Sequence, residues 1–368
     1  MNGVFLNPVE VHFGLGCIER LPQVLGDRRA VIVTFPEAAQ IGLVQRVRAL
    51  CGDSVVAVID DVQPNPDVTH LAGLYRDFWQ RYDWQSHEHC SVIVAIGGGS
   101  VLDTAKTLMV GTESGDFAEL LALLDTGKPF TPPRVKSLIT VPTTSGTGSE
   151  VTPWATIWDR TIKQRKYSLQ LPQTWPEAAI VDPELTLSLP LSVTVQSGLD
   201  ALSHALEAIW NVNANPISDE FAVSAARDML ATLPALAANL QDRTLRERAS
   251  LAALKAGLAF SNTKTALAHS ISYEMTIHHG LPHGIACSFT LPMVLDLALG
   301  KNAGRDAVLA KIFPCRLADA AAYLTGFLES LGVRTSFSSY GVTAEESDRM
   351  IAHALSGPRG RNFIATGV

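Results

Sequence analysis

Four histidines lie close together in the segment ALAHSISYEMTIHHGLPHGIACS, residues 266–288. They are His269, His278, His279 and His283, in a chain that has ten histidines altogether. Imidazoles bind transition metals and transfer protons near neutral pH. Adjacent side chains diverge, so at most one of His278 and His279 can face the same point as the other two. A single histidine is more often a core or surface residue, so a metal site requires partners from elsewhere.

The segment GLDALSHALEAIW offers such partners. Asp200 and His204 are four residues apart and would project from one face of a helix, with Glu207 one turn further along. Taken alone, an aspartate and a histidine at this spacing are usually a hydrogen-bonded couple. Together with His269 and His283, however, two helical segments each supply a pair of groups that a divalent transition metal accepts.

A glycine-rich segment, GGGSVLDTAK, indicates phosphate binding. Gly97, Gly98, Gly99 and Ser100 lie between an expected strand and an expected helix. A turn without side chains lets a phosphate reach the backbone amides at the positive end of the helix dipole. The pattern is not GxGxxG, and three glycines alone are equally consistent with a tight turn.

A second loop of this kind, PTTSGTGSE, follows another expected strand. Its hydroxyl groups, including those of Thr143, Thr144 and Thr147, could hydrogen-bond to phosphate or ribose. Alone it could be a flexible surface loop. Two such loops at equivalent strand ends favour a dinucleotide.

The first half of the chain alternates β-branched runs with helical patterns. Strands are expected at 29–35, 54–60, 91–100 and 137–146, and helices at 38–50, 68–82 and 101–111. Continuous apolar strands separated by helices predict a parallel sheet that is covered on both faces. Such sheets bind ligands at the carboxyl ends of their strands.

Beyond about residue 190 the pattern becomes entirely helical. Helices are expected at 192–211, 216–239, 243–260, 264–276, 284–299, 304–332 and 343–355. The sequence therefore predicts an α/β dinucleotide-binding domain, residues 1–188, and an all-helical metal- and substrate-binding domain, residues 189–368. A cleft between two domains is the usual place for a ligand.

Composition narrows the class of partner. The 368 residues are 47% hydrophobic and 18% charged, and the net charge is −7. A negative net charge argues against nucleic acid as a partner, because a phosphate-binding face needs a basic excess. No uninterrupted apolar run reaches the roughly 18 residues of a membrane helix, and the first residues lack a signal-peptide pattern. Five scattered cysteines without a CxxC pair indicate reduced thiols. A cytoplasmic protein is expected, with neither nucleic acid nor membrane as a partner.

The motifs GGGSVLDTAK, PTTSGTGSE, GLDALSHALEA and LPHGIACS occur in an order and spacing that resemble the iron-dependent (group III) alcohol dehydrogenases. That family shares its fold with glycerol dehydrogenase and dehydroquinate synthase. The resemblance covers nearly the whole chain and implies a Rossmann-like α/β domain followed by an all-α domain. It also implies one divalent metal, Fe2+ or alternatively Zn2+, bound by Asp200, His204, His269 and His283. NAD(H) or NADP(H) would be the cofactor, and a homodimer or larger homo-oligomer the assembly.

The resemblance also assigns roles to the cofactor-binding residues. The GGGS residues would hold the pyrophosphate, and the threonines of PTTSGTGSE would line the same cleft. Lys166 resembles the family's ribose-contacting lysine, and Asp103 would contact the nicotinamide side of the cofactor. The reaction implied is hydride transfer between C4 of the nicotinamide and the carbonyl carbon of a small aldehyde, whose oxygen the metal would coordinate.

Two positions depart from the family pattern. Tyr273 stands where many relatives carry a further histidine, so the proton donor would be Tyr273, His278, His279 or water. Phe35 stands where many NAD-preferring relatives end the first strand with aspartate. The preference between NAD and NADP is therefore open.

At a finer level, NTKTALAHSISYEM, TPWATIWD and GPRGRNFI resemble the phosphonoacetaldehyde reductase branch, which forms 2-hydroxyethylphosphonate. Lys264, Arg359 and Arg361 are candidate cations for the phosphonate, with Lys264 expected on the same helix as His269. Single lysines and arginines near a chain end are, however, mostly solvated.

Three alternatives compete with this substrate. The first is a dehydrogenase of the same type for lactaldehyde, glycerol, maleylacetate or a simple alcohol. The second is a dehydroquinate synthase-like lyase that uses NAD only transiently. The third is a non-catalytic nucleotide- or metal-binding protein with the same fold.

Overall fold

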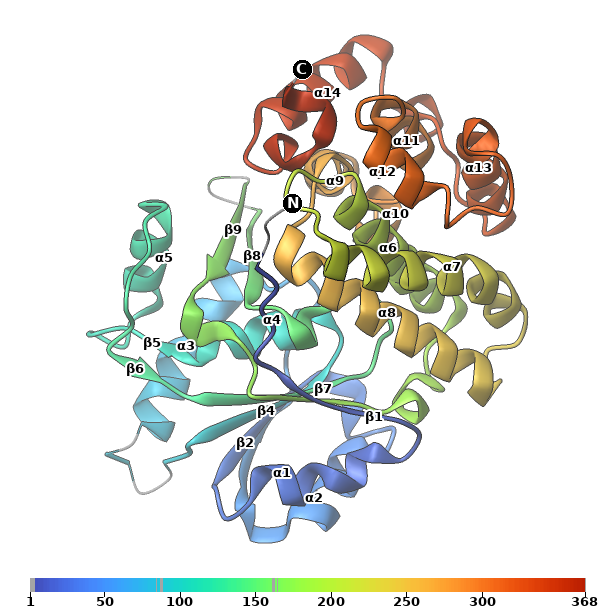
Figure 1. The fold of residues 1–368 in the computed structure, drawn as a ribbon. Helices are drawn as coiled ribbons and strands as arrows, with labels where there is room; N and C mark the ends of the chain where they lie inside the picture. Colours follow the sequence, from blue (N-terminus) through green and yellow to red (C-terminus); the bar gives the residue numbers. More distant parts are fainter. Residues whose placement is uncertain (1–3, 84, 87–88, 161–162, 164, 368) are drawn as a thin grey trace. The chain divides into compact units, whose positions relative to one another are not determined.

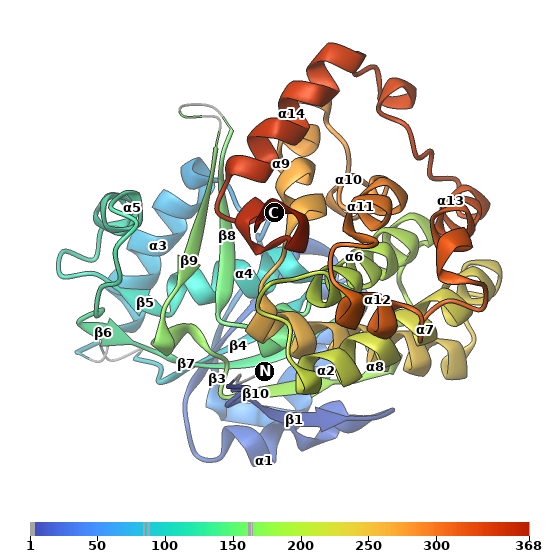
Figure 2. The ribbon, with the colours of Figure 1, turned by 45° about the horizontal axis from the view of Figure 1, so that its top comes forward.

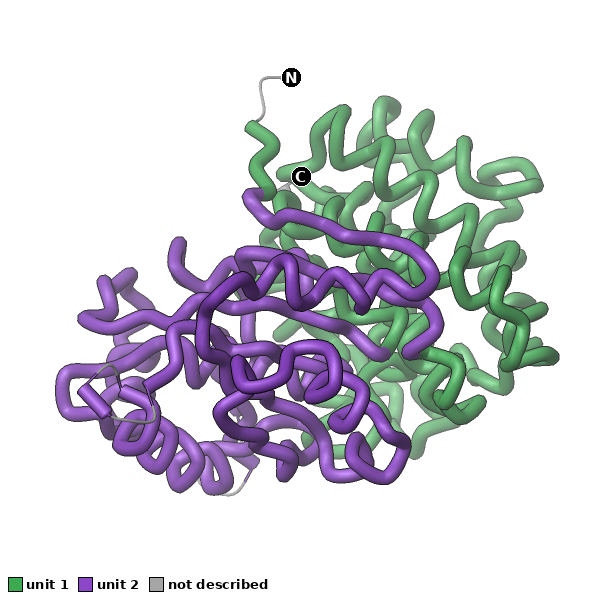
Figure 3. The backbone as a smooth tube through the Cα atoms, turned by 90° about the horizontal axis from the view of Figure 1, so that it is seen from below, with its two compact units in different colours: residues 1–7, 144–148, 186–368 green, residues 8–143, 149–185 purple. Residues whose placement is uncertain are grey.

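The computed structural model describes residues 4–83, 85–86, 89–160, 163 and 165–367. The chain forms two compact units, which Figure 3 shows in different colours. The first is an α/β unit of residues 8–143 and 149–185. The second is a helical unit of residues 1–7, 144–148 and 186–368. Two short segments from the first half of the chain thus group with the helices.

The α/β unit is built on a parallel sheet of six strands in the order β1-β10-β7-β4-β2-β3. The strands are β1 (Glu10–Phe13), β2 (Ala30–Thr34), β3 (Val55–Ile59), β4 (Val92–Gly97), β7 (Ser137–Pro142) and β10 (Ala178–Val181). The predicted parallel α/β class and its four predicted strands are confirmed. Strands β1 and β10 were not predicted.

Helices cover both faces of this sheet (Figure 1). They are α1 (Leu21–Leu25), α2 (Leu43–Cys51), α3 (Val68–Tyr82), α4 (Gly99–Leu108) and α5 (Phe117–Asp125). Along β2, Val31 and Val33 belong to the core that contains α3, α4 and α5, whereas Ala30 and Ile32 belong to the core that contains α1 and α2. A strand that is buried on both faces explains the continuous apolar run in its sequence.

Two small antiparallel pairs complete the unit. A hairpin pairs β8 (Trp154–Asp159) with β9 (Arg165–Gln170), and a second pair joins β5 (Val110–Gly111) to β6 (Arg134–Val135). Neither pair was predicted. In β9 buried and exposed side chains alternate near the end of the strand, a weaker signal than the apolar runs of the main sheet.

The helical unit contains nine α-helices among the described residues. They are α6 (Leu191–Ile209), α7 (Pro216–Ala238), α8 (Arg243–Thr263), α9 (Leu267–His279), α10 (His283–Ala286), α11 (Leu291–Ala298), α12 (Ala303–Leu309), α13 (Ala320–Ser330) and α14 (Ala344–Ser356). Helices α6, α7 and α8 pack together, α10 packs on α6, and α14 packs on α9 (Figure 2). The predicted all-helical character is confirmed.

Two predicted helices are each divided in the structure. The segment 284–299 forms α10 and α11, and the segment 304–332 forms α12 and α13. Pro292 lies in the first turn of α11, and Pro314 lies between α12 and α13. Proline cannot donate a backbone hydrogen bond inside a helix, so each lies at a break or at a start.

Helix α7 is long and apolar enough to cross a membrane by length and composition. Its inward-facing residues, among them Ala226, Met229 and Leu233, are buried inside the unit. Because α7 also packs against α6 and α8, its apolar character is that of a core helix.

Candidate metal centre

Helix α6 carries the first two candidate metal ligands. Asp200 and His204 lie one turn apart on this helix, and only 3% and 5% of their surfaces are exposed. His269 lies in the first turn of α9 and is also buried, whereas His283 begins α10 and is partly exposed. Three helices therefore supply the four residues that the sequence predicted as ligands.

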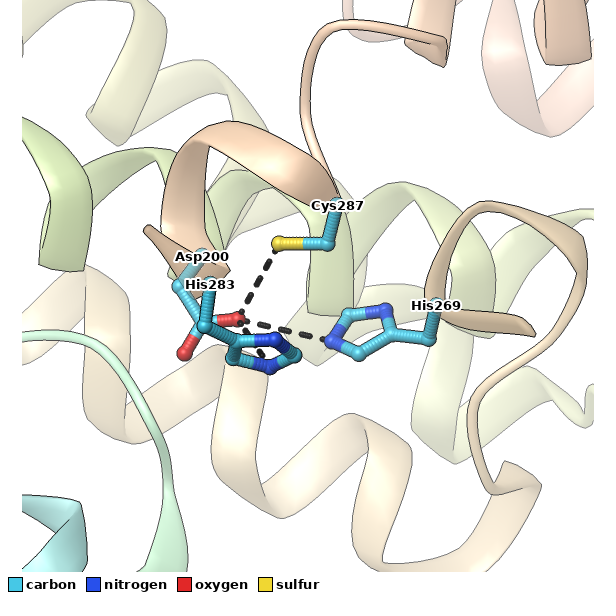
Figure 4. A group of neighbouring side chains, drawn as sticks. All are labelled: Asp200, His269, His283 and Cys287. Atoms are coloured by element: carbon cyan, nitrogen blue, oxygen red, sulfur yellow. Dashed lines mark hydrogen bonds and ion pairs between the residues drawn. The ribbon is translucent and has the colours of Figure 1, made fainter. Parts of the chain in front are cut away.

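These side chains converge on one carboxylate oxygen. The Nε2 atoms of His269, His204 and His283 lie 3.4, 3.8 and 3.8 Å from Oδ1 of Asp200. Figure 4 shows Asp200, His269 and His283 pointing towards one another. The arrangement places three imidazole nitrogens around a single carboxylate.

Cys287 is a neighbour that the sequence analysis missed. Ligand atoms of Asp200, His269, His283 and Cys287 all lie within 4.8 Å of one another. The Sγ atom of Cys287 donates a hydrogen bond of 3.4 Å to Oδ1 of Asp200. Its position four residues after His283, one helical turn, was the available signal.

His204 stands outside that mutual set, although its Nε2 atom lies near Asp200. Its ring stacks on Phe260 with centroids 4.0 Å apart, and on His269 with centroids 4.5 Å apart. Burial lowers the pKa of His204 to about 4, which leaves a neutral imidazole at neutral pH. Burial raises the pKa of the Cys287 thiol, which therefore stays protonated. Since metals bind neutral imidazole and thiolate, the chemistry favours His204 as the fourth donor.

The electrostatics of Asp200 fit a cation partner. Burial alone would raise the pKa of its carboxyl group. The facing imidazoles, first His204 and then His269 and His283, outweigh burial and hold the pKa well below its ordinary range. Asp200 is therefore a carboxylate at neutral pH.

Close backbone contacts bring α10 and the 144–148 segment against α6. A Cβ atom on Gly284 would lie 2.0 Å from the backbone oxygen of Gln196, and one on Gly146 would lie 2.6 Å from that of Ser197. Only glycine allows these approaches. The glycine after His283 thus lets α10 approach α6, which carries Asp200.

A divalent transition metal fits these residues. The Nε2 atom of His269 is buried, and it makes no well-aligned hydrogen bond to any described residue, although Asp200 Oδ1 lies 3.4 Å away. A buried polar atom without a partner indicates a missing ligand or water. One carboxylate and three imidazoles are a donor set that iron and zinc both accept.

In the α/β unit, the structure brings the glycine turn beside the end of β7. Gly97 pairs with Pro142 in the sheet, and the backbone N–H of Thr143 donates to the carbonyl oxygen of Gly97 at 3.0 Å. A Cβ atom on Gly97 would lie 2.5 Å from the Val101 side chain, so this glycine also serves strand-to-helix packing. Gly98 and Gly99 follow it into α4. The Oγ atom of Ser100 accepts a hydrogen bond from the Asn65 backbone N–H.

The other residues expected to bind the cofactor differ in their burial and in their interactions. Thr144 and Thr147 are half-buried in the segment that belongs to the helical unit. Both carboxylate oxygens of Asp103 accept hydrogen bonds, one from Ser149 Oγ and one from the Thr156 backbone N–H. The charge of Lys166 acts on Asp103, and its Nζ atom lies 6.0 Å from the Trp158 ring centroid.

Other sequence candidates lie apart from the four converging side chains. The Nε2 atom of His279 lies 3.2 Å from Glu346 on α14, and His278 is exposed. Lys264 was predicted on the helix of His269, but this prediction is wrong. It ends α8 with a left-handed φ of 66° and is exposed, because the chain turns there before α9 begins at Leu267.

Tyr273 and Arg359 form a pair. Tyr273 lies one turn after His269 on α9, and the Arg359 guanidinium carbon is 5.0 Å from the Tyr273 ring centroid. Arg361 is exposed and donates to the backbone oxygen of Ser356. Of the three candidate cations, Arg359 thus packs on the helix that carries His269.

Family models match both parts of the chain. The model described as iron-containing alcohol dehydrogenase matches residues 8–183, and the model of that family's C-terminal region matches residues 194–365. The chain belongs to the iron-containing alcohol dehydrogenases. It is accordingly an oxidoreductase, a metal- and NAD(P)-dependent alcohol dehydrogenase or aldehyde reductase, and the predicted family is confirmed.

Known relatives cover nearly the whole chain. The NAD-dependent methanol dehydrogenase of Bacillus methanolicus is 32% identical, over 96% of this chain and 93% of its own. The NADPH-dependent butanol dehydrogenase of Clostridium saccharobutylicum is 28% identical, over 98% and 94%. The crystal structure of sulfoacetaldehyde reductase from Bifidobacterium kashiwanohense in complex with NAD+ superposes with a TM-score of 0.88, at 30% identity, over 99% and 94%.

Proposed function

We propose that this enzyme reduces phosphonoacetaldehyde, an aldehyde that carries a phosphonate group, to 2-hydroxyethylphosphonate. The observation that carries the proposal is the stacking of Arg359 on Tyr273, 5.0 Å from its ring centroid. Tyr273 lies one turn from His269, a proposed metal ligand, on the same helix face. A fixed cation near the metal suits an aldehyde with an anion at its other end.

Arg359 is held in place by more than the ring. Its Nε atom donates a hydrogen bond of 2.9 Å to Thr265 Oγ1. An arginine fixed through Nε still has two terminal nitrogens for a planar, paired contact with phosphonate oxygens. The neighbouring Asn362 donates to the backbone oxygen of Thr265, which ties the same C-terminal segment to the start of α9.

Tyr273 is the proposed proton donor to the product oxygen. Burial raises the pKa of its phenol group to about 12, although the charge of Arg359 opposes the shift. The phenol therefore keeps its proton at neutral pH. A histidine at this position would be partly deprotonated there.

The four proposed ligands, Asp200, His204, His269 and His283, supply one negative charge and three neutral imidazoles. A divalent metal bound there supplies a Lewis acid for the aldehyde carbonyl, and a reduced nicotinamide supplies the hydride. With a single carboxylate the site keeps a net positive charge, which attracts an oxygen on which negative charge develops. The glycine turn at Gly97–Ser100 would hold the dinucleotide pyrophosphate at the start of α4.

One structural neighbour supports an anionic aldehyde as the substrate, and other relatives support a neutral one. Sulfoacetaldehyde, the substrate in the name of one structural neighbour, carries a sulfonate where phosphonoacetaldehyde carries a phosphonate. Other relatives are named for methanol and butanol, so lactaldehyde, glycerol, maleylacetate or a simple alcohol is the competing substrate class. Membership of an alcohol dehydrogenase family argues against the lyase and the non-catalytic alternatives. A cytoplasmic location and a homo-oligomer are part of the same proposal.

Steady-state reduction of phosphonoacetaldehyde, sulfoacetaldehyde and propanal tests this proposal, with NADH and NADPH and with added Fe2+ or Zn2+. We expect the highest kcat/KM for phosphonoacetaldehyde. Arg359→Gln should lower that value about 10- to 100-fold, the worth of hydrogen bonds to a charged group, and should lower the value for propanal much less. Arg361→Gln distinguishes the two arginines and should change neither value. A preference for propanal, or an equal loss on all aldehydes in Arg359→Gln, would contradict the proposal.

A further inference from the structure

The carboxylate of Glu207 is completely buried on α6, one turn beyond His204. Its two oxygens face the start of α9. Oε2 accepts a hydrogen bond of 2.9 Å from the Ala266 backbone N–H, and Oε1 accepts from the N–H groups of Ala268 and His269 at 2.5 and 3.2 Å. A fully buried charge with this many directed contacts has a specific task.

One part of that task is to cap α9. The N-cap residue of α9 is Ala266, whose side chain cannot accept a hydrogen bond. The first amides of a helix require acceptors and favour a negative charge. Glu207 supplies both from α6, although it lies about sixty residues earlier in the chain.

The second part concerns the His269 side chain. Oε2 of Glu207 lies 2.7 Å from Nδ1 of His269, while Nε2 of the same ring lies 3.4 Å from Asp200. A neutral imidazole that donates from Nδ1 leaves Nε2 as an unprotonated electron-pair donor. Carboxylates commonly hold metal-binding histidines in this way, through the nitrogen that does not bind the metal.

We propose that Glu207 is a positioning residue that fixes the tautomer and the orientation of His269 for metal binding. Helix α6 then determines three of the four donor groups, since it carries Asp200 and His204 and orients His269 through Glu207. The inference rests on the proposed metal site, but not on any particular substrate.

A purely structural role makes a different prediction. If Glu207 only caps α9, its loss lowers the stability of the fold and leaves the metal affinity of the folded protein unchanged. Asp242 offers a matched control, because its side chain caps α8 by accepting from the Leu245 N–H. Asp242→Asn weakens a helix cap that contacts no proposed ligand.

The experiment measures Zn2+ affinity by chelator competition in metal-depleted protein, and the absorption spectrum after Co2+ is added. We expect Glu207→Gln to weaken Zn2+ binding by about 10- to 100-fold and to change the Co2+ bands. Asp242→Asn should lower the thermal midpoint without either effect. Wild-type affinity and spectrum in Glu207→Gln, or equal weakening in both variants, would overturn the inference.

Two further measurements separate the possible failures. If His269→Ala binds Zn2+ as tightly as the wild type, the proposed metal site itself is wrong; if only Glu207→Gln is without effect, the positioning role alone is wrong. If Glu207→Gln does not fold, nitrogen NMR of the Zn2+-loaded wild type reports directly which ring nitrogen of His269 keeps its proton. His269→Asn identifies the signal. Protonation at Nδ1 is expected, and protonation at Nε2 would overturn the inference.

Discussion

Each unit of the enzyme contains a buried cluster of charged groups, and the two clusters differ in how completely their hydrogen bonds are satisfied. In the α/β unit, Nζ of Lys106 donates to the Ser149 backbone oxygen, to Ser149 Oγ and to the Trp154 backbone oxygen at 2.6, 2.7 and 2.8 Å. In the helical unit, Nε2 of His269 lies 3.4 Å from Asp200 Oδ1 and makes no well-aligned hydrogen bond to any described residue.

The difference separates a structural cluster from a ligand site. An ammonium group has three donors, and Lys106 uses all three on this chain's own oxygens. Lys106 therefore has no donor left for a ligand, and its hydrogen bonds join α4 to the 149–154 segment. In the helical unit, by contrast, Nε2 of His269 and Oδ1 of Asp200 face each other at 3.4 Å, and both are atoms that a divalent metal accepts as ligands.

The largest effect on turnover is expected at the proposed metal site of the helical unit. His269→Ala removes one proposed donor, which is also the imidazole that Glu207 is proposed to position. Turnover should fall by at least about 10³-fold, because a metal's polarisation of a carbonyl is worth several kcal/mol. Binding of NAD(H) or NADP(H) should persist, since the expected pyrophosphate site lies in the other unit. Turnover, bound metal and dinucleotide affinity are measured on the same preparation.

His353→Ala is the matched control for that variant. His353 is exposed on α14 and lies 2.5 Å from Glu274, on the outer part of α9. Turnover and metal content should stay at wild-type values. Normal turnover in metal-analysed His269→Ala would contradict the ligand assignment and remove the contrast between the two clusters.

A large effect on stability is expected at Lys106 in the α/β unit, where all hydrogen-bond donors of the ammonium group are used. Lys106→Met leaves the Ser149 and Trp154 backbone oxygens and the Asp103 carboxylate without the Lys106 ammonium group. The free energy of unfolding should fall by about 3–4 kcal/mol, the usual cost of breaking a buried charged network. Denaturant unfolding measures it. The exposed Lys128→Met should change stability by no more than about 0.5 kcal/mol. A small loss in Lys106→Met would show that the cluster is not structural.

The pH dependence of stability tests the same cluster more finely. Burial raises the pKa of Glu150 from 4.5 to about 7, with Lys106 partly opposing. The neutral carboxyl therefore stabilises the fold fully below pH 4.5, and this contribution is lost as the pH rises through about 7. Between these values the wild type should lose up to about 3 kcal/mol relative to Glu150→Gln.

Lys106 titrates in a separate window. Burial lowers the pKa of Lys106 from 10.5 to about 8. The neutral amine therefore makes its full contribution to the free energy of unfolding above pH 10.5, and this contribution is lost as the pH falls to about 8. For Glu150, the free energies of unfolding of the wild type and of Glu150→Gln are measured at several pH values, and their difference gives the contribution of the carboxyl group. Parallel curves for the wild type and Glu150→Gln would show that Glu150 does not titrate in this range.

Local spacing in the sequence revealed much of the fold and of the candidate site. Apolar runs located the four central strands, and the i,i+4 spacing of Asp200 and His204 placed both on one helix. These features depend on residues that are neighbours in the chain. For the same reason, the breaks before α11 and α13 could have been predicted from Pro292 and Pro314.

Features that depend on contacts between residues far apart in the chain could not be predicted from the sequence. Glu207 reaches His269 across more than sixty residues, and its neighbours in the sequence give no sign of that contact. The left-handed turn at Lys264 is also a tertiary effect, because lysine has no preference for positive φ. The spacing of Cys287 from His283 was a local signal, but its contact with Asp200 joins residues 87 positions apart in the chain.

The smallest expected effect concerns Phe35, at the carboxyl end of β2. Phe35 is partly buried against the cores on both faces of the sheet. The family resemblance places it where many NAD-preferring relatives are expected to carry an acid. Phe35→Asp should lower kcat/KM with NADPH about tenfold relative to NADH, because a carboxylate there repels a 2′-phosphate by about 1.4 kcal/mol. Phe35→Asn is the uncharged control and should show no such discrimination. If both variants lose stability and bind NADH and NADPH equally weakly, Phe35 stabilises the α/β unit, as Lys106 does, and does not select the cofactor.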